Sequence, residues 1–168
     1  AALAGPNSRE LLSKLFPETN ILNEALPFMG YKESDLFDVP ARIFRISFSG
    51  ELAYEINVES SYGTFMWEKI IEFGQEMNIE PYGTEARSTL RIEMGHVAGS
   101  ELDGRTIPYD VSLEGMLSKK KDCIGKRSLT REAFLKPKRE KVVGVIPLDK
   151  KTTIPEGSHL VKDGNASS

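Results

Sequence analysis

The 168-residue sequence has few of the residues on which several common kinds of functional site depend. Its single cysteine, Cys123, cannot form an internal disulfide, which indicates a reducing, cytoplasmic compartment and a buried, unreactive thiol. The two histidines, His96 and His159, have no neighbour at metal-ligand spacing, so we expect no metal site. Glycine-rich phosphate-binding loops and the serine turn of hydrolases are also missing, which argues against nucleotide-binding and serine-hydrolase classes.

Long hydrophobic runs are absent as well. No apolar stretch approaches the roughly 20 residues that cross a bilayer, and the first residues lack the basic flank and apolar core of a secretion signal. Hydrophobic residues still make up 39 % of the chain and charged residues 28 %, as in a protein with a real core and a solvated surface. We therefore expect no membrane partner and one ordinary domain, or one domain and the beginning of another.

Charge is unevenly distributed along the chain, although the formal net charge is only −3. The segment 119–151 holds twelve Lys or Arg and four Asp or Glu, a local net of +8 that leaves −11 for the remainder. A nucleic-acid interface would need aromatic side chains to stack on bases, and Phe134 is the one aromatic in this segment. A solvated face, an anionic small ligand or an acidic neighbouring subunit therefore ranks above nucleic acid.

Hydrophobic spacing predicts an α+β fold. Apolar residues recur at helical spacing in four segments, which we expect to be helices: 6–16, 63–77, 84–94 and 126–135. A short strand is expected at Phe28–Met29, and two alternating runs around a glycine-containing link predict a hairpin over Ile43–Val58. We expect this hairpin to pack on the 63–77 helix, with one buried set: Phe44, Ile46, Tyr54, Ile56, Trp67 and Ile70.

The last part of the sequence predicts two further strands, at Val142–Ile146 and His159–Val161. The chain then ends at a turn signal, Asp163-Gly164, with no partner strand expected after it. Together with a start that lacks Met, this pattern indicates a sequence cut at both ends.

Two features stand out chemically. Glu55 lies in the middle of a predicted strand, where a carboxylate usually marks the solvated face of a half-buried sheet. Arg87 and Arg91 stand four residues apart on one predicted helix, where like charges repel. Each arginine should therefore have an anionic partner: Glu85, Glu93 or Asp110 within the chain, or a ligand carboxylate.

Four motifs occur in the same order as in a known family and cover nearly the whole chain. They lie at residues 45–56, 83–95, 103–108 and 118–129. Together they resemble the folate-binding aminomethyltransferases of glycine cleavage and their relatives, the dimethylglycine and sarcosine dehydrogenases and the large subunits of sarcosine oxidases. Residues 118–121 and 154–161 are most similar to the sarcosine oxidase branch.

The resemblance implies a ferredoxin-like, folate-binding domain over residues 1–140 and the start of a C-terminal β-barrel over 141–168. It implies that Glu55 hydrogen-bonds the pterin of tetrahydrofolate and that Arg87 lies in the folate pocket. Phe48 stands where the family usually has Tyr, so it offers ring contact without a hydroxyl. The family's catalytic aspartate falls upstream of Ala1, so no catalytic residue is expected within this sequence.

The leading hypothesis is the tetrahydrofolate-binding module of a sarcosine oxidase alpha subunit, an enzyme of one-carbon metabolism. Such a module captures the one-carbon unit released from sarcosine as 5,10-methylenetetrahydrofolate. Flavin, NAD and the other subunits of the hetero-oligomeric oxidase would belong to other parts of the complex, and this segment alone would be inactive. A glycine-cleavage aminomethyltransferase and a non-catalytic interaction domain of the same fold remain alternatives.

Overall fold

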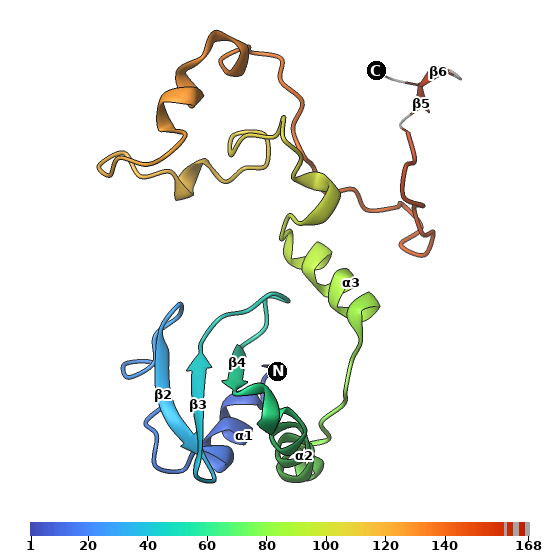
Figure 1. Cartoon of the computed structure of the whole chain (residues 1–168). Coiled ribbons are helices and arrows are strands. Elements are labelled where there is room, and N and C mark those ends of the chain that lie inside the picture. Colours follow the sequence, from blue (N-terminus) through green and yellow to red (C-terminus); the bar gives the residue numbers. More distant parts are fainter. Residues whose placement is uncertain (160, 163–164, 167–168) are drawn as a thin grey trace. The chain divides into compact units, whose positions relative to one another are not determined.

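The computed structural model describes residues 1–159, 161–162 and 165–166 of an α+β chain. The chain divides into two compact units, Ala1–Ala98 and Gly99–Ser168 (Figure 1). Among the described residues, no helix combines the length and the apolar character needed to cross a membrane.

The first unit is built on a four-stranded antiparallel sheet with the strand order β1-β4-β3-β2 (Figure 1). The strands are β1 (Ala2–Ala4), β2 (Tyr31–Leu36), β3 (Val39–Phe44) and β4 (Ala53–Val58). The helices are α1 (Ser8–Leu15), α2 (Gly63–Gly74) and α3 (Thr84–Met94), with short 3-10 turns at Ser60–Tyr62 and Gln75–Met77. The ferredoxin-like order βαββαβ is not the one observed, because β4 follows β3 directly and α2 comes after it.

The register between β3 and β4 decides which side chains enter the core. Ile43 pairs with Ile56, and both side chains are fully buried. Since neighbouring strand residues point to opposite faces, the adjacent pair Phe44 and Glu55 lies on the other face. The sheet therefore has one apolar face against the helices and one face that carries polar groups.

The core forms between that apolar face and the helices α1 and α2. Helix α1 contributes three buried leucines and α2 contributes Met66 and Ile70. Tyr54 is fully buried, and its hydroxyl accepts a hydrogen bond of 2.8 Å from Arg9 Nε. Ser8 is also buried and donates its hydroxyl to the carbonyl of Leu52 at 2.9 Å, so both polar groups are satisfied.

Three expectations for this unit are corrected. The core face of β3 carries Val39, Ala41 and Ile43, so Phe44 and Ile46 are only half-buried. Trp67 is 47 % exposed instead of buried, because it lies on the side of α2 that turns away from the core.

The strand expected at Phe28–Met29 is a turn, and the strand of this region is β2, which begins at Tyr31. Met29 has a positive φ of 66°, which ends regular extended structure just before the strand.

The second unit consists mainly of loops and short 3-10 turns at Gly99–Glu101, Glu114–Met116, Lys126–Thr130 and Glu132–Phe134. The expected helix over 126–135 is broken into the last two of these, because Arg131 adopts an extended conformation between them. Thr130 also donates its hydroxyl to the carbonyl of Arg127 at 2.8 Å, a local bond that competes with helical pairing. Cys123 is exposed, contrary to expectation.

A buried carboxylate links two distant segments of the second unit. Asp110 is 8 % exposed and accepts hydrogen bonds from the guanidinium of Arg139, with Nε at 2.8 Å, and from the backbone N–H of Ile107 at 3.0 Å. The backbone N–H of Val142 donates to the carbonyl of Asp110 at 2.8 Å. Both the side chain and the backbone of Asp110 thus hold residues 139–142.

The strand expected at Val142–Ile146 does not form. Val143 and Ile146 are 71 % and 79 % exposed, and no described strand lies beside them to supply ladder hydrogen bonds. The later strand begins at Val161 instead of His159, and Leu160 lies outside the described residues. It pairs as β5 (Val161–Lys162) with β6 (Asn165–Ala166), so a partner strand does follow it. The start of a C-terminal barrel, like the boundary after residue 140, stays a prediction.

Replacing a core residue and replacing Trp67 should have different effects on stability. Ile56→Ala should lower the free energy of unfolding by about 2–5 kcal/mol, because it opens a cavity in the fully buried core. Trp67→Ala should cost about 1 kcal/mol or less, because almost half of the indole already faces solvent. Urea denaturation of both variants measures the difference, and equal losses would contradict the position of Trp67 outside the core.

Asp110→Asn should destabilise the second unit in a pH-dependent way. The hydrogen bond from Arg139 holds the pKa of Asp110 below its usual range, against the opposing effect of burial and with help from the Ile107 N–H. Because the pKa of Asp110 is lower in the folded state than in the unfolded state, the ionised carboxylate stabilises the fold at pH values above about 3.9, the ordinary pKa of Asp. This stabilisation is lost as the pH falls from that value through the lower pKa of the folded state. Melting temperatures of wild type and variant should therefore differ at neutral pH, begin to converge below about pH 4, and meet only below the lowered pKa of Asp110 in the folded state.

The exposed carboxylate of Glu132 provides the control, since it accepts no side-chain hydrogen bond among the described residues. Glu132→Gln should leave the melting temperature nearly unchanged across the same pH range. If the difference in melting temperature between wild type and Asp110→Asn stayed the same at acid pH, the ionised pair with Arg139 would not be what stabilises the unit.

Candidate functional site

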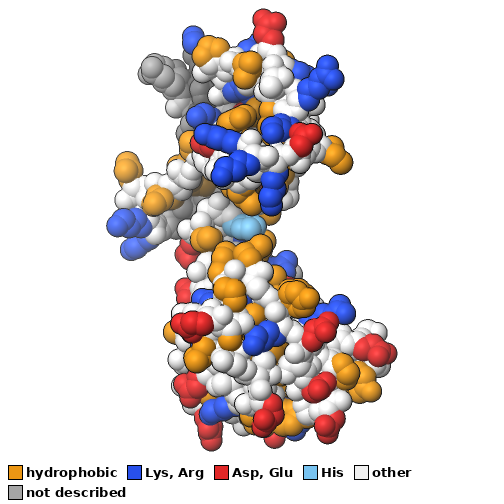
Figure 2. Space-filling model, turned by 90° about the vertical axis from the view of Figure 1, so that its left-hand side faces the viewer, with side chains coloured by type: hydrophobic (Ala, Val, Ile, Leu, Met, Phe, Trp, Pro, Cys, Tyr) orange, Lys and Arg blue, Asp and Glu red, His pale blue; other side chains and the backbone are white. Residues whose placement is uncertain are grey.

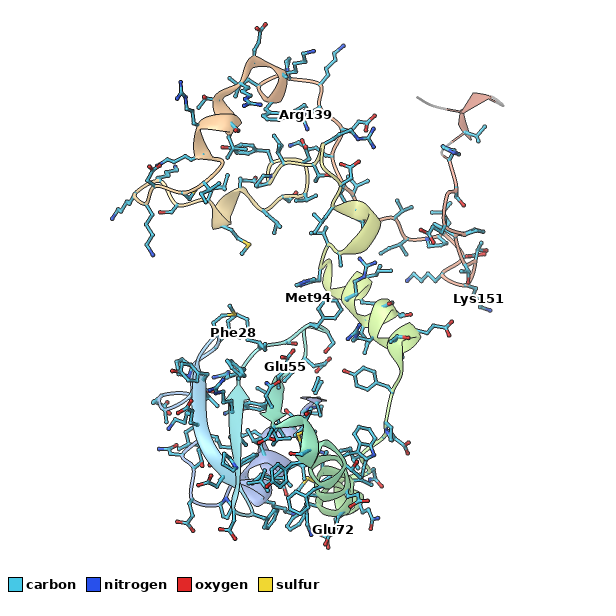
Figure 3. The ribbon with its side chains drawn as sticks, viewed as in Figure 1. Phe28, Glu55, Glu72, Met94, Arg139 and Lys151 are labelled. Atoms are coloured by element: carbon cyan, nitrogen blue, oxygen red, sulfur yellow. The ribbon has the colours of Figure 1, made fainter. Side chains whose placement is uncertain are left out.

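Glu55 lies in the middle of β4, on the sheet face opposite the core (Figure 3). It is half-buried, with Phe44 beside it on β3 and Ala2 beside it on β1. Its carboxylate makes no hydrogen bond or ion pair within the described part of the chain, and no buried oxygen there lacks a partner. The carboxylate is thus an accessible acceptor with no protein donor.

Strand β1 flanks Glu55 on the other side of β4. It pairs with β4 in antiparallel register, so Ala2 lies opposite Glu55 and Leu3 opposite Tyr54. The backbone N–H of Ile56 donates a hydrogen bond of 2.8 Å to the carbonyl of Ala1. The backbone around Glu55 is thus held by hydrogen bonds to β1 as well as to β3.

Phe48 lies on the turn that follows β3. The hydroxyl of Ser47 accepts a hydrogen bond of 3.0 Å from the N–H of Gly50, which closes the turn. Gly50 has a φ of +86°, and a Cβ at this position would come within 2.9 Å of the Met94 sulfur. The positive φ therefore favours glycine at this position, and a larger residue would also have to displace the Met94 side chain.

Three side chains meet at this turn. The guanidinium of Arg87 lies over the Phe48 ring, with its carbon 5.3 Å from the ring centroid. The imidazole of His96 lies against the same ring at a centroid distance of 4.8 Å and an interplanar angle of 56°. Phe48 itself is 37 % exposed. Sequence reasoning missed His96, because only the three-dimensional structure brings it to Phe48.

The position of His96 follows from the end of α3. Gly95 is left-handed at the C-cap, with a φ of 77°, and its N–H donates to the carbonyls of Arg91 and Ile92. The N–H of His96 donates to the carbonyl of Arg91 at 2.8 Å, and Arg91 Nη1 donates to the carbonyl of His96 at 3.2 Å. The end of α3 thus holds His96 through both its backbone N–H and its backbone carbonyl.

The expected carboxylate partners of Arg87 are not the ones observed. Asp110 pairs with Arg139, and neither Glu85 nor Glu93 forms a described ion pair with Arg87. The helix itself is confirmed at Thr84–Met94, but none of its residues is buried. The structure therefore brings Arg87 and Phe48 together, whereas no described contact joins Glu55 to either.

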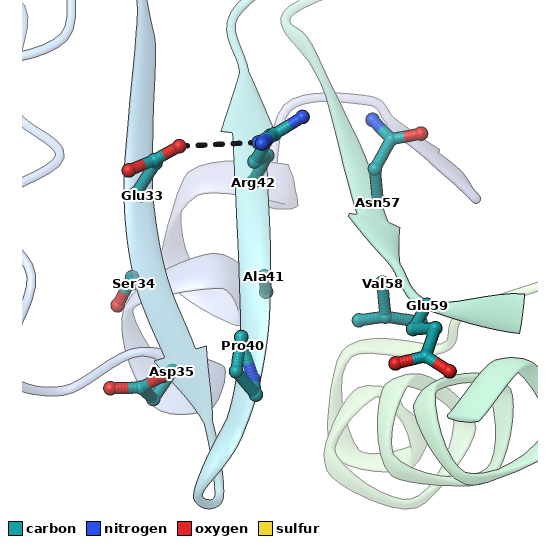
Figure 4. A pocket seen from close by; sticks show the side chains of 9 residues that line it. All are labelled: Glu33, Ser34, Asp35, Pro40, Ala41, Arg42, Asn57, Val58 and Glu59. Atoms are coloured by element: carbon teal, nitrogen blue, oxygen red, sulfur yellow. Dashed lines mark hydrogen bonds and ion pairs between the residues drawn. The ribbon is translucent and has the colours of Figure 1, made fainter. Parts of the chain in front are cut away.

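Two hollows lie in the first unit near these residues. Arg87 lines a cavity of about 230 Å³ together with Trp67, Tyr82 and residues 1–4. A second groove of about 710 Å³ crosses β2, β3 and β4, and its lining includes an ion pair of 3.2 Å between Arg42 on β3 and Glu33 on β2 (Figure 4). Neither hollow contains all three predicted binding residues. Within the described ranges, no group of three or more His, Cys, Asp or Glu side chains could hold a metal ion.

Comparison with known proteins gives relatives along nearly the full chain. The sarcosine oxidase subunit alpha of Corynebacterium sp. (strain P-1) is 44 % identical over 97 % of the chain and 17 % of its own length. The mitochondrial dimethylglycine dehydrogenase of Mus musculus is 33 % identical over 95 % of the chain and 18 % of its own length. An aminomethyltransferase of Chlorobium phaeovibrioides is 30 % identical over 82 % of the chain and 37 % of its own length.

The chain thus spans about one sixth of the length of the sarcosine oxidase subunits that it matches. A family match covers residues 1–121, which include both the turn with Phe48 and the helix with Arg87. On this match, and on the identities with the sarcosine oxidase subunits, the chain belongs to the GCVT N-terminal domain family.

Proposed function

We propose that this chain is the tetrahydrofolate-binding module of a sarcosine oxidase alpha subunit. In that role it holds the acceptor that captures the one-carbon unit from sarcosine demethylation as 5,10-methylenetetrahydrofolate. The identity of 44 % to a sarcosine oxidase subunit over 97 % of the chain supports this assignment. The lower identity of 30 % to an aminomethyltransferase makes that activity the second candidate.

The observation that carries the proposal is the unpaired, half-buried carboxylate of Glu55. An ionised carboxylate has two acceptor oxygens and no donor. The pterin ring of folate presents a ring N–H and an amino group side by side, which is the donor pattern that a carboxylate accepts in a bidentate manner. A half-buried acceptor with no protein donor gains more from such a ligand than a fully solvated one does.

Arg87 and Phe48 also suit folate, because they offer chemical properties that Glu55 lacks. A guanidinium and a phenyl ring 5.3 Å apart offer a cation and a flat apolar surface in one place. Folate combines planar rings with carboxylates, so it can use both properties. The three residues therefore fit tetrahydrofolate by their donor and acceptor types.

The main contribution of this module to the reaction is to position the one-carbon acceptor. Tetrahydrofolate supplies the nucleophilic nitrogens that take up the one-carbon unit. The residues of this chain bind and orient that acceptor, which raises the rate by proximity. Flavin, NAD and partner subunits would act in other parts of the oxidase.

A non-catalytic interaction domain is a third candidate, and folate titration separates it from the two enzymatic ones. An interaction domain of the same fold would show no saturable tetrahydrofolate binding in the complete protein. For an aminomethyltransferase, folate binding would be retained, and the one-carbon donor would be a lipoyl-bound intermediate instead of the product of sarcosine oxidation.

Glu55→Gln in the complete protein should weaken tetrahydrofolate binding by about 10- to 100-fold. A charge-assisted hydrogen bond contributes roughly 1.5–3 kcal/mol, and about 1.4 kcal/mol corresponds to a factor of ten. The substitution keeps the shape of the side chain, so the melting temperature should stay the same. Isothermal titration calorimetry with tetrahydrofolate measures the change in affinity.

Glu33→Gln serves as the matched control. Glu33 lies on β2 on the same sheet face, and its replacement removes the same charge. It should leave tetrahydrofolate affinity within a factor of about two, because its ordinary partner is Arg42. Equal affinity of wild type and Glu55→Gln, with equal melting temperatures, would mean that Glu55 is only a solvated strand residue.

A further inference from the structure

A groove of about 740 Å³ lies in the second unit, between the loop 103–110 and the segment 133–142. Its lining contains five cationic side chains and three carboxylates. The cations are Arg105, Lys136, Lys138, Arg139 and Lys141, and the carboxylates are Asp103, Asp110 and Glu140. The groove is thus built mainly from the basic segment of the sequence.

Internal carboxylates already neutralise the two arginines. Asp103 accepts hydrogen bonds from Arg105 Nε at 2.8 Å and from Nη2 at 2.6 Å. Asp110 accepts both Nε and Nη2 of Arg139, whose guanidinium also lies 5.3 Å from the centroid of the Phe134 ring. These two arginines therefore add no excess charge to the groove, because each is paired with a carboxylate.

The three lysines are different. Lys136, Lys138 and Lys141 are exposed, and none of their ammonium groups makes an ion pair or hydrogen bond to another described residue. Glu140 is the remaining carboxylate of the lining. The pKa of Asp110 is lowered mainly by the hydrogen bond from Arg139, and the charge of Lys141 lowers it a little further. The lining of the groove therefore carries unbalanced positive charge. Figure 2 shows several Lys and Arg side chains on the face of the second unit that is turned toward the viewer.

We propose that this groove binds a small polyanion that carries two or more carboxylate or phosphate groups. A volume of about 740 Å³ lies within the range of small-molecule sites, roughly 300–1,000 Å³. Three flexible ammonium groups act as separate point charges, which suits several anionic groups on one ligand better than a single planar one. The site is independent of Glu55, Arg87 and Phe48.

Nucleic acid fits the groove less well than a small polyanion does. Binding of single strands needs aromatic faces on which bases stack. Phe134 is the one aromatic residue of the lining, and the guanidinium of Arg139 already covers it. The lining thus offers charge and volume but no free stacking surface.

Calorimetric titration of the 168-residue chain with citrate and with tripolyphosphate tests the proposal. At an ionic strength of about 0.01 M, where exposed charges are weakly screened, at least one of the two should bind with a Kd below about 1 mM. The preferred probe distinguishes a carboxylate ligand from a phosphate ligand. In addition, backbone amide signals of residues 136–142 should shift during the titration.

Two triple variants separate a built site from diffuse charge. Lys136→Gln/Lys138→Gln/Lys141→Gln should weaken binding by about tenfold or more. Lys119→Gln/Lys120→Gln/Lys121→Gln removes the same charge from exposed lysines of the basic segment that do not line the groove, and should change affinity by less than about twofold.

Both triples alter exposed side chains, and unchanged melting temperatures would show that each variant folds. Equal losses in the two triples would overturn the proposal, because the binding would then follow net charge alone. Failure of the wild-type chain to bind either anion would overturn it as well. So would an absence of shifts in the backbone amide signals of residues 136–142, a measurement that needs no substitution.

Discussion

The pairing of Ile43 with Ile56 is the constraint on which the first unit depends. Strand side chains alternate between faces, so this one register assigns every residue of β3 and β4 to the core or to the opposite face. A slip of one residue would turn Ile56 outward and press the carboxylate of Glu55 against the buried leucines of α1. Burying that carboxylate without a partner would cost several kcal/mol, so the hydrophobic core itself keeps Glu55 accessible.

The end of β3 explains why Phe48 leaves the core while Ile43 enters it. Arg45 closes the sheet, since its N–H donates to the carbonyl of Gly30 and its carbonyl accepts the N–H of Met29, both at 2.9 Å. Its guanidinium also donates to the carbonyl of Leu26 at 3.1 Å. After these hydrogen bonds of Arg45 the chain turns, and the Phe48 ring then contacts the guanidinium of Arg87 instead of the apolar face of the sheet.

Sequence patterns predicted the elements with strong helical periodicity, and α3 was predicted to the residue at Thr84–Met94. They failed for β2, because Tyr31–Leu36 is an edge strand whose polar side chains give no alternating signal. They also chose the wrong face of β3, since Phe44 and Ile46 are more hydrophobic than Ala41, yet only the register with β4 decides which face is covered. Glu55 was predictable as an isolated strand carboxylate, whereas the meeting of Phe48 with His96 depends on the fold.

The arrangement of charge in the first unit has a physical consequence for ligand binding. If Glu55 and Arg87 formed an ion pair, a ligand would have to break it and desolvate both groups before using either. Instead, Arg87 lies on the Phe48 ring, a weaker interaction that leaves its N–H donors available, and Glu55 keeps both acceptor oxygens. A ligand that reaches either group can therefore form a charge-assisted contact with it without first breaking an ion pair between the two.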